Sequence, residues 1–245
     1  MEGSGDSTPI VFLHGVGSDK SVWRPQLEHF GRTRRAVAFD YPGYGESDLV
    51  EGATRDNFAA SILAAMSALG IGRTHVCGLS LGGVIAMAMH AAASDRCSSL
   101  IIADSFAVHP EGQGIYDRSV AASHTMTMRA LAEARSGMLL GSTATDELRA
   151  EVIDTMAGID PAAYRIGAEA VWLADQRDRA AAIDVPTLIL VGDEDAITPP
   201  ALSEELHRLI CGSRLELIAG AGHLANAEAP RAFNSAIESF LTQLG

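Results

Sequence analysis

Positively charged residues are scarce in this chain of 245 residues. Lys and Arg together number 18 against 31 Asp and Glu, which leaves a formal net charge of −13. A chain with this charge repels phosphate backbones, so we expect no nucleic-acid partner. The single lysine, Lys20, lies in a polar stretch that is typical of a solvated loop. Schiff-base chemistry would depend on that one residue and is not expected.

Cysteine pairs, metal-binding motifs and cofactor fingerprints are also lacking. The three cysteines, Cys77, Cys97 and Cys211, include no C-x-x-C pair, which argues against a disulfide framework and a zinc–thiolate site. The sequence contains no H-E-x-x-H motif, no P-loop and no G-x-G-x-x-G fingerprint. We therefore expect neither a metal ion nor a cofactor.

Long apolar segments are missing as well. No run approaches the ~20 apolar residues that a membrane-spanning helix needs. The first residues, MEGSGDSTP, have neither the basic nor the apolar region of an export signal. We therefore expect a cytoplasmic protein that does not contact a membrane, and the sequence leaves open whether it forms a homodimer.

Short apolar runs alternate with longer helical patterns along the chain. Most of these runs are continuously apolar, as is typical of strands that are covered on both faces of a parallel sheet. Repeated strand–helix–strand units predict an α/β fold with a doubly wound, mainly parallel sheet of about six strands. The expected strands are 10–13, 35–39, 74–77, 100–103, 187–191 and 214–218, and the expected helices are 21–30, 55–69, 81–93, 200–210 and 230–244.

Residues 108–184 interrupt this alternation. They contain no convincing strand but show helical patterns over 126–140, 145–156 and 161–173. A segment of about 75 residues is too long for a structureless loop in a compact domain. We predict that 108–184 form a helical cap, inserted into a core domain that is made of 1–107 and 185–245.

The strongest chemical motif is Gly78-Leu79-Ser80-Leu81-Gly82, a G-x-S-x-G sequence between an expected strand and an expected helix. This context is typical of a nucleophile elbow, in which a serine occupies a sharp strand-to-helix turn. The turn places the Ser80 hydroxyl at a helix N-terminus, where peptide dipoles favour developing negative charge. We predict that Ser80 is a catalytic nucleophile.

A serine nucleophile needs a base, and a histidine base needs an acid that orients it. His223 follows the last expected strand, where a chain order of serine, acid and histidine requires the base. Asp195 lies a few residues past the fifth expected strand, before a Pro-bounded turn, and we predict it as the acid. Asp193 and Glu194 are expected to form the turn and to face solvent. Asp104, at the end of the fourth expected strand, is the competing acid.

Two backbone N–H groups are expected to stabilise the oxyanion. One belongs to Leu81, the residue after the nucleophile. The other belongs to Val16, in the loop after the first expected strand, with Gly17 as the alternative. Such fixed donors contribute about 3–4 kcal/mol each to the transition state. His14 is expected to brace this loop.

Five motifs stand along the chain in a fixed order: VFLHGVGSDKSVW, FDYPGYGESD, GLSLGG, LVGDEDAITPP and AGHLANAEAP. In this order they resemble an α/β-hydrolase fold enzyme over nearly the whole chain. The first resembles the family's oxyanion segment and the second its turn, where Asp40 and Ser47 would be structural. Within the family, the resemblance is greatest to the 3-oxoadipate enol-lactonase and related esterase group, through WLADQRDRAAAIDVPTLILVGDEDAITPP and the AGHLANAEAP tail.

The sequence departs from this family in what precedes Ile10, because family members usually carry one or two further strands there. We therefore expect the sheet to lack those edge strands. The serine in the elbow disfavours haloalkane dehalogenases and epoxide hydrolases, whose elbow carries Asp, and dienelactone hydrolases, which carry Cys.

Together these features predict a serine hydrolase that cleaves a small carboxylic ester or lactone through an acyl-enzyme, with enol-lactonase-like activity implied by the resemblance. The alternatives are a C–C bond hydrolase or cofactor-free perhydrolase with the same triad, and a non-catalytic ligand-binding protein of this fold. The candidate substrate-binding residues are Met126, Met128, Arg129, Arg135 and Trp172, with Arg129 or Arg135 as the anchor for an acidic lactone.

Overall fold

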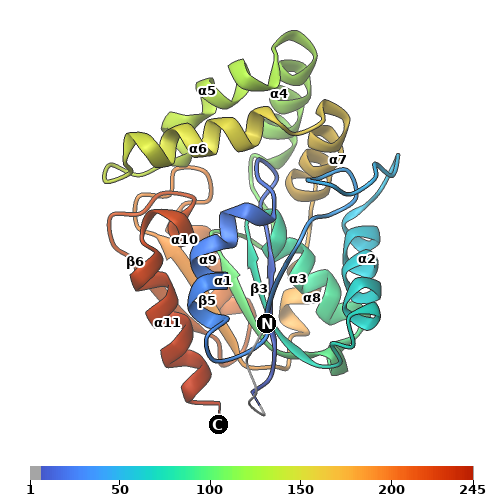
Figure 1. Cartoon of the computed structure of the whole chain (residues 1–245), viewed down its shortest axis with the longest axis vertical. Coiled ribbons are helices and arrows are strands. Elements are labelled where there is room, and N and C mark those ends of the chain that lie inside the picture. Colours follow the sequence, from blue (N-terminus) through green and yellow to red (C-terminus); the bar gives the residue numbers. More distant parts are fainter. Residues whose placement is uncertain (1–6, 245) are drawn as a thin grey trace.

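A parallel sheet forms the centre of the structure, a computed structural model that describes residues 7–244. The strands are β1 (Ile10–Leu13), β2 (Ala36–Phe39), β3 (Thr74–Leu79), β4 (Cys97–Ala103), β5 (Thr187–Gly192) and β6 (Arg214–Ile218). They pair in the order β2-β1-β3-β4-β5-β6, and every neighbouring pair is parallel. The predicted α/β fold with a parallel sheet of six strands is thereby confirmed (Figure 1).

Three strands are longer than their sequence patterns indicated, β5 by Gly192 alone. β3 continues to Leu79, so the sheet reaches the G-x-S-x-G turn. β4 begins at Cys97 rather than at Leu100 because Ser99, although polar, is buried and its hydroxyl lies 2.8 Å from His75 Nδ1. A buried polar side chain with a partner is compatible with a strand interior, but it adds nothing to an apolar pattern.

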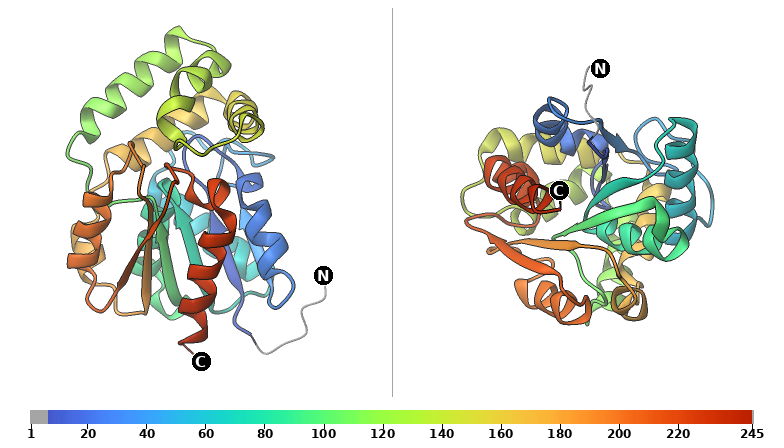
Figure 2. Two further views of the ribbon diagram at one scale, coloured as in Figure 1. Left: turned by 90° about the vertical axis from the view of Figure 1, so that its left-hand side faces the viewer. Right: turned by 90° about the horizontal axis from the view of Figure 1, so that it is seen from below.

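Helices cover both faces of the sheet. One face carries η1 (Lys20–Trp23), α1 (Arg24–Phe30), α10 (Ala225–Glu228) and α11 (Pro230–Thr242), and the other carries α2 (Arg55–Ala68), α3 (Leu81–Ala92), α8 (Arg177–Ala181) and α9 (Pro200–Leu209). In β1, Ile10 and Phe12 pack under the first layer, whereas Val11 and Leu13 pack under the second. Because successive strand residues point to opposite sides, a continuous apolar run supplies both cores. Figure 2 shows the helical layers on the two faces of the sheet.

The segment between β4 and β5 is helical. It contains α4 (Gly112–Thr125), α5 (Met128–Leu139), α6 (Asp146–Ala157) and α7 (Pro161–Trp172), followed by α8. The side chains of Thr127, Thr145 and Asp160 accept hydrogen bonds from first-turn N–H groups of α5, α6 and α7, as N-cap residues do. α5 packs on α6 and α4 on α7, and these four helices lie above the carboxyl ends of the strands (Figure 1).

The sequence did not predict α4. Its residues, GQGIYDRSVAASHT, include two glycines and few large apolar side chains. The buried residues of this helix are Gly112, Ser119 and Ser123. Ile115, Tyr116 and Ala122 of α4 pack against the same core but are only partly buried, so the apolar stripe of this helix is weak in the sequence.

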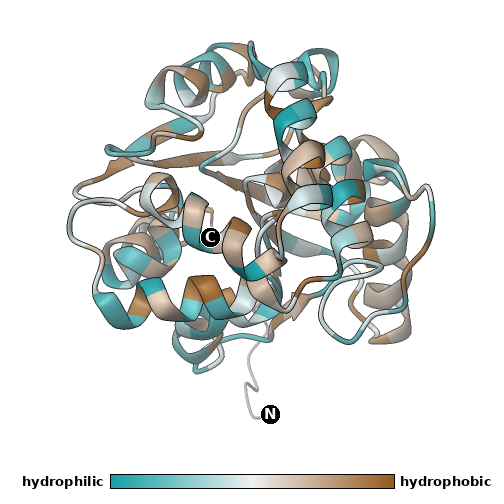
Figure 3. Cartoon of the chain, turned by 90° about the horizontal axis from the view of Figure 1, so that it is seen from above, coloured by the Kyte–Doolittle hydropathy of each residue, from teal (hydrophilic) through white to brown (hydrophobic). Residues whose placement is uncertain are grey.

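The outer helices bury one side and expose the other. Seen from above, hydrophilic and hydrophobic residues alternate along them (Figure 3), as is typical of amphipathic helices at a protein surface. Within residues 7–244, none of the helices combines the length and the hydropathy that crossing a membrane requires.

Replacing Leu188 of β5 by alanine should strongly destabilise the fold. Its side chain is fully buried, and such changes cost about 2–5 kcal/mol of unfolding free energy. Leu217 of the neighbouring β6 is 57% exposed. Leu217→Ala is therefore the matched control and should change that free energy by less than ~0.5 kcal/mol. Urea unfolding followed by circular dichroism measures both, and equal losses would contradict the burial assigned to β5.

Candidate active site

Ser80 occupies a sharp turn between β3 and α3. Its backbone has φ 54° and ψ −114°, in the positive-φ region that residues with a side chain rarely adopt. The Ser80 N–H donates to the Ala103 carbonyl at 2.9 Å. A Cβ at Gly78 would lie 2.1 Å from the Gly82 carbonyl oxygen, and one at Gly82 would lie 2.0 Å from that of Leu13. The glycines of the motif therefore allow β3, α3 and β1 to converge beneath the serine.

His223 and Asp195 form a buried pair at the carboxyl ends of β6 and β5. Their side chains are 5% and 0% exposed, and His223 Nδ1 lies 2.9 Å from Asp195 Oδ2. Asp195 Oδ1 accepts from the Ile197 and Thr198 N–H groups at 2.8 and 2.9 Å, and Oδ2 accepts from Thr198 Oγ1 at 2.6 Å. An ionised carboxylate can only accept, so it holds the imidazole proton on Nδ1 and leaves Nε2 free to take a proton.

The surroundings keep Asp195 ionised. Burial alone would raise its pKa, but the charge of His223 and hydrogen bonds from His223 and Thr198 lower the pKa of Asp195 to about 2. The backbone of His223 is held from the insertion, because its amide N–H donates to the Leu139 carbonyl of α5 at 2.9 Å. The base is thus positioned by loops from both the sheet and the insertion.

Asp104, the competing acid, lies in a different environment. Burial and the neighbouring Asp195 charge raise the pKa of Asp104 well above its usual range. Its Oδ1 accepts from the Gly192 N–H at 2.8 Å. Within residues 7–244, no hydrogen bond or ion pair joins Asp104 to His223. The geometry therefore favours Asp195 as the partner of the histidine and leaves Asp104 as a neutral carboxyl that holds the start of the β5 loop.

Ser80 and His223 line one cavity of about 230 Å³ between the sheet and the insertion. In the described part of the chain, the buried Ser80 Oγ has no hydrogen-bond partner. Catalytic hydrogen bonds of this kind commonly tighten only when substrate binds. The remaining lining residues from the core are Gly15, Val16, Gly17, Ser18, Ser21, Val22, Arg24, Pro25, Glu28, Leu79, Leu224 and Ala227, and those from the insertion are Arg135, Leu139, Leu148, Glu151, Val152, Thr155, Met156, Tyr164 and Trp172.

Two of the five substrate-binding candidates, Arg135 and Trp172, line this cavity. The other three do not. Met126 is 38% exposed at the end of α4, and Met128 is buried in the apolar core. Arg129 lies at the surface, where it forms an ion pair with α6 at 2.7 Å. Only one side of α5 faces the cavity, and the sequence pattern of that helix did not indicate which side this is.

Sequence reasoning missed Tyr164, which lines the cavity, and His109, which packs against the predicted residue Trp172. The Tyr164 Oη and Trp172 Nε1 atoms are buried without a hydrogen-bond partner among the described residues, and both side chains line the cavity wall. Buried polar groups are nearly always paired, so these are two donors of lining residues whose partner the described residues do not supply. His109 Nε2 donates to the Ile197 carbonyl at 3.2 Å, in the loop of Asp195, and its ring packs edge-on against Trp172.

The loop between β1 and η1 places Val16 close to Ser80. Val16 lines the cavity, and a Cβ at Gly15 would lie 3.5 Å from Ser80 Cβ. Leu81 is the first residue of α3, so its N–H has no acceptor within the helix. Both residues that were predicted as oxyanion donors therefore stand next to the serine.

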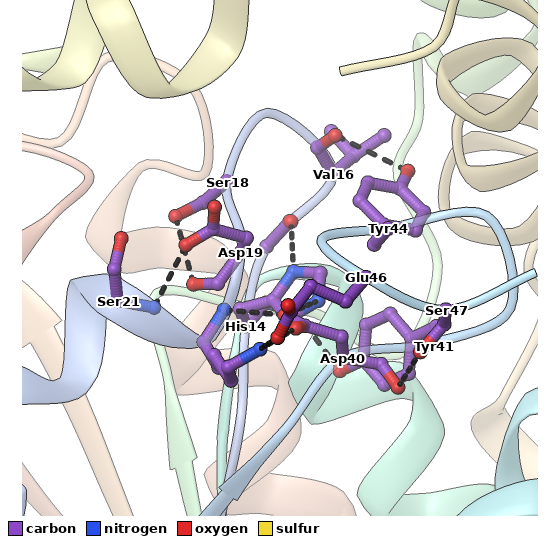
Figure 4. Close-up of polar contacts among 12 residues, drawn as sticks. His14, Val16, Ser18, Asp19, Ser21, Asp40, Tyr41, Tyr44, Glu46 and Ser47 are labelled. Carbon is purple, nitrogen blue, oxygen red and sulfur yellow. Dashed lines mark hydrogen bonds and ion pairs between the residues drawn. The ribbon is translucent and has the colours of Figure 1, made fainter. Parts of the chain in front are cut away.

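A buried polar network lies behind this loop (Figure 4). His14 Nδ1 donates to the Gly15 carbonyl at 2.8 Å. The Tyr41 and Tyr44 hydroxyls donate to the carbonyls of His14 and Val16 at 3.0 and 3.2 Å. Burial lowers the pKa of His14, so its ring is neutral and its single N–H is the one on Nδ1. The expected bracing role of His14 agrees with these contacts.

The only lysine has a structural place in the same network. Lys20 Nζ lies 2.6 Å from Asp40 Oδ2 and 3.5 Å from Glu46 Oε2. The hydrogen bond to Asp40 raises the pKa of Lys20, so its amine stays charged and is a poor nucleophile. The Ser47 hydroxyl donates to the Asp40 carbonyl at 3.4 Å. Asp40 and Ser47 thus hold the turn after β2, as the family resemblance implied.

Known proteins resemble this chain over nearly its full length. A sequence model described as the alpha/beta hydrolase fold matches residues 8–230. The chain is 28% identical to 3-oxoadipate enol-lactonase 1 of Acinetobacter baylyi, over 100% of this chain and 92% of that protein. Among solved structures, a malate-bound thermophilic esterase from Thermogutta terrifontis superimposes with a TM-score of 0.91 at 29% identity, covering 98% of this chain and 91% of that one. An enol-lactonase from Burkholderia xenovorans LB400 gives 0.91 at 28% identity, covering 98% and 94%.

Replacing Asp195 by asparagine should lower kcat by roughly 10⁴-fold, because an amide does not hold the His223 proton on Nδ1. Asp104→Asn is the matched control. Its amide oxygen still accepts from the Gly192 N–H, and the amide is neutral like the protonated carboxyl that it replaces. The kcat of this variant should therefore stay within about tenfold of the wild-type value. Steady-state hydrolysis of p-nitrophenyl acetate measures both. A loss in Asp104→Asn as large as that in Asp195→Asn would assign the acid to Asp104.

The same control variant should flatten the pH dependence of stability. Folding raises the pKa of Asp104. Above the ordinary aspartate pKa of about 4, the unfolded chain therefore loses the Asp104 proton, whereas the folded chain retains it. This group therefore makes wild-type stability fall as pH rises from that point until the raised pKa is passed. Thermal unfolding between about pH 4 and pH 8 should show a smaller decline for Asp104→Asn.

Proposed function

Because the chain belongs to the alpha/beta hydrolase fold family, we propose that it is a serine hydrolase that cleaves a small carboxylic ester or lactone through an acyl-enzyme. The observation that carries this proposal is the buried His223–Asp195 pair, which opens onto the same cavity as the strained Ser80. A carboxylic ester hydrolase needs just such a nucleophile with an oriented base beside it.

In the proposed reaction, Ser80 Oγ attacks the carbonyl carbon while its proton moves to His223 Nε2. Asp195 holds the imidazole by its Nδ1–H and stabilises the imidazolium that forms. The N–H groups of Val16 and Leu81 donate to the oxyanion of the tetrahedral intermediate. The C–O bond then breaks, and the leaving oxygen takes the proton from Nε2. Water repeats the sequence on the acyl-enzyme, which releases the acid and restores Ser80.

The cavity favours a compact substrate. Its volume of about 230 Å³ lies below the usual range for drug-sized ligands, and its walls include Val152, Met156 and Leu139. A longer acyl chain would have to displace these packed side chains, so we expect activity to fall beyond about six acyl carbons. The Tyr164 and Trp172 donors, which have no partner within residues 7–244, favour an acyl group that carries a further oxygen atom.

Two arginines, Arg24 and Arg135, line the cavity, and the second of them favours an acidic substrate. Arg24 forms an ion pair with Glu151, and both line the cavity. Arg135 also lines it and, within residues 7–244, has no carboxylate partner. We propose Arg135 as the anchor for a substrate carboxylate, as in an enol-lactone with an acidic side chain. The resemblance to enol-lactonases and to an esterase with bound malate supports this choice.

We also propose that residues 108–184 act as a cap over a core of 1–107 and 185–245. α5, α6 and α7 supply one wall of the cavity, while the strand ends supply Ser80 and His223. α8 is the exception, because it packs against α3 and α9 of the core. The cytoplasmic location stays a prediction of the sequence.

Ser80→Ala should lower kcat by at least about 10³-fold and should abolish labelling by a fluorophosphonate probe. Ser98→Ala, at the amino end of β4, is the control and should behave like the wild type. The substrate for these measurements is chosen by screening p-nitrophenyl esters of rising chain length, lactones and enol-lactones. Wild-type activity in Ser80→Ala would end the serine-hydrolase proposal, and labelling without turnover of any ester or lactone would favour a binding protein.

Arg135→Gln should remove a preference for acidic substrates. A charge-assisted hydrogen bond contributes about 1.5–3 kcal/mol, so kcat/KM for a carboxylated lactone should fall roughly 10- to 100-fold, with little change for its methyl ester. Arg129→Gln is the matched control, since Arg129 lies on the same helix but outside the cavity. If the wild type prefers the methyl ester, the acidic-lactone assignment fails and a general short-chain carboxylesterase remains.

A further inference from the structure

Three consecutive carbonyls in the loop after β1 accept hydrogen bonds from buried side chains (Figure 4). Tyr41 holds the His14 carbonyl, His14 holds that of Gly15, and Tyr44 holds that of Val16. Within a trans peptide, a C=O group and the following N–H group point in opposite directions. Holding the Gly15 and Val16 carbonyls therefore also fixes the directions of the Val16 and Gly17 N–H groups, in a loop that lines the cavity.

Tyr44 is the third donor of this network. Its ring is fully buried, and its centroid lies 5.0 Å from that of the His14 ring and 5.9 Å from that of the Tyr41 ring. Burial raises the pKa of Tyr44, so the hydroxyl stays protonated and donates. In Figure 4 this hydroxyl points towards Val16 at the outer end of the network.

α7 of the insertion closes against this contact at Gly167. A Cβ at position 167 would lie 2.0 Å from Tyr44 Oη and 3.0 Å from Val16 Cγ2. α7 can therefore sit at its observed distance only because residue 167 has no side chain. One helix of the insertion thus confines both the hydroxyl and the residue whose carbonyl it holds.

We propose that Tyr44 is a positioning residue that fixes the oxyanion-donor loop, and that α7 holds it in place through close contact at Gly167. The proposal rests on the proposed function, because it gives the Val16 loop a role in stabilising an oxyanion. It follows that the seating of the insertion and the geometry of the donor loop are coupled. A displacement of α7 would free Tyr44 and loosen the Val16–Gly17 peptide, which carries the Gly17 N–H and directly follows the Val16 N–H donor.

Tyr44→Phe tests the positioning role, since it removes the hydroxyl and keeps the ring packing. We expect kcat to fall about tenfold with KM changed less than about twofold, because the donor acts mainly in the transition state. The Ki of a trifluoromethyl ketone analogue of the best ester should rise by the same factor. If Tyr44 had only a structural role, Tyr44→Phe would lower the thermal unfolding temperature but leave the Ki of the folded enzyme unchanged. Titration with a fluorophosphonate measures how much of the enzyme is folded.

Gly167→Ala tests the contact with α7, and Gly137→Ala is its matched control. Both glycines lie inside helices of the insertion, but among the residues that the structure describes a Cβ at Gly137 would meet nothing within 4 Å. Alanine is the better helix former at both positions, so a loss confined to Gly167→Ala cannot come from helix propensity. We expect this variant to lose about as much kcat as Tyr44→Phe, on the order of tenfold, and Gly137→Ala to lose none.

The double variant decides whether the two residues act together. Without the Tyr44 hydroxyl, the closest obstacle to the new Cβ is gone, so Gly167→Ala should cost less kcat in Tyr44→Phe than in the wild type. Wild-type kcat and Ki in Tyr44→Phe, in an enzyme that Ser80→Ala inactivates, would overturn this inference and leave the proposed function standing. Additive losses would overturn the coupling to α7.

If Ser80→Ala left the activity unchanged, the proposed function itself would fail. If Gly167→Ala does not fold, Tyr44→Phe decides the positioning role alone.

Discussion

The close approach of three backbone segments beneath Ser80 is the constraint on which the rest of the site depends. A Cβ on Gly78 or Gly82 would meet carbonyl oxygens at 2.1 or 2.0 Å, and one on Gly83 would meet the Ser105 hydroxyl at 2.6 Å. With no side chains there, α3 starts directly at the carboxyl end of β3, and the serine takes a positive φ. The strain is held by the packed sheet on either side, as is usual at functional sites.

Two buried carboxyl groups near the histidine illustrate how surroundings assign different states to the same chemical group. Asp195 receives hydrogen bonds from Ile197, Thr198 and His223 and keeps its charge. Asp104 receives fewer donors, lies near the Asp195 charge, and holds its proton. Two carboxylates so near each other would repel, so the protonation of one supports the ionisation of the other.

The insertion contributes to the site as well as covering it. α5 offers a carbonyl to the backbone N–H of His223, α7 brings Tyr164 and Trp172 to the cavity wall, and the same helix touches the network behind the donor loop. Each contact joins a segment of the insertion to a loop at the carboxyl end of the sheet. The nucleophile, base and donor loop are therefore held in one frame by packing from two directions, which is how preorganised sites keep their geometry.

Local patterns in the sequence determined the six-stranded parallel core, the elbow at Ser80, and the loops that carry Asp195 and His223. These could be predicted because buried parallel strands are apolar on both faces and because a strained turn requires glycine at set positions. The tertiary structure alone decided which side of α5 meets the cavity, so Arg135 lines it while Met128 and Arg129 do not. It also decided which side of α4 would be buried, and that Tyr44 would meet Val16 and Gly167. Such contacts depend on how distant segments pack, and no periodicity within one segment records them.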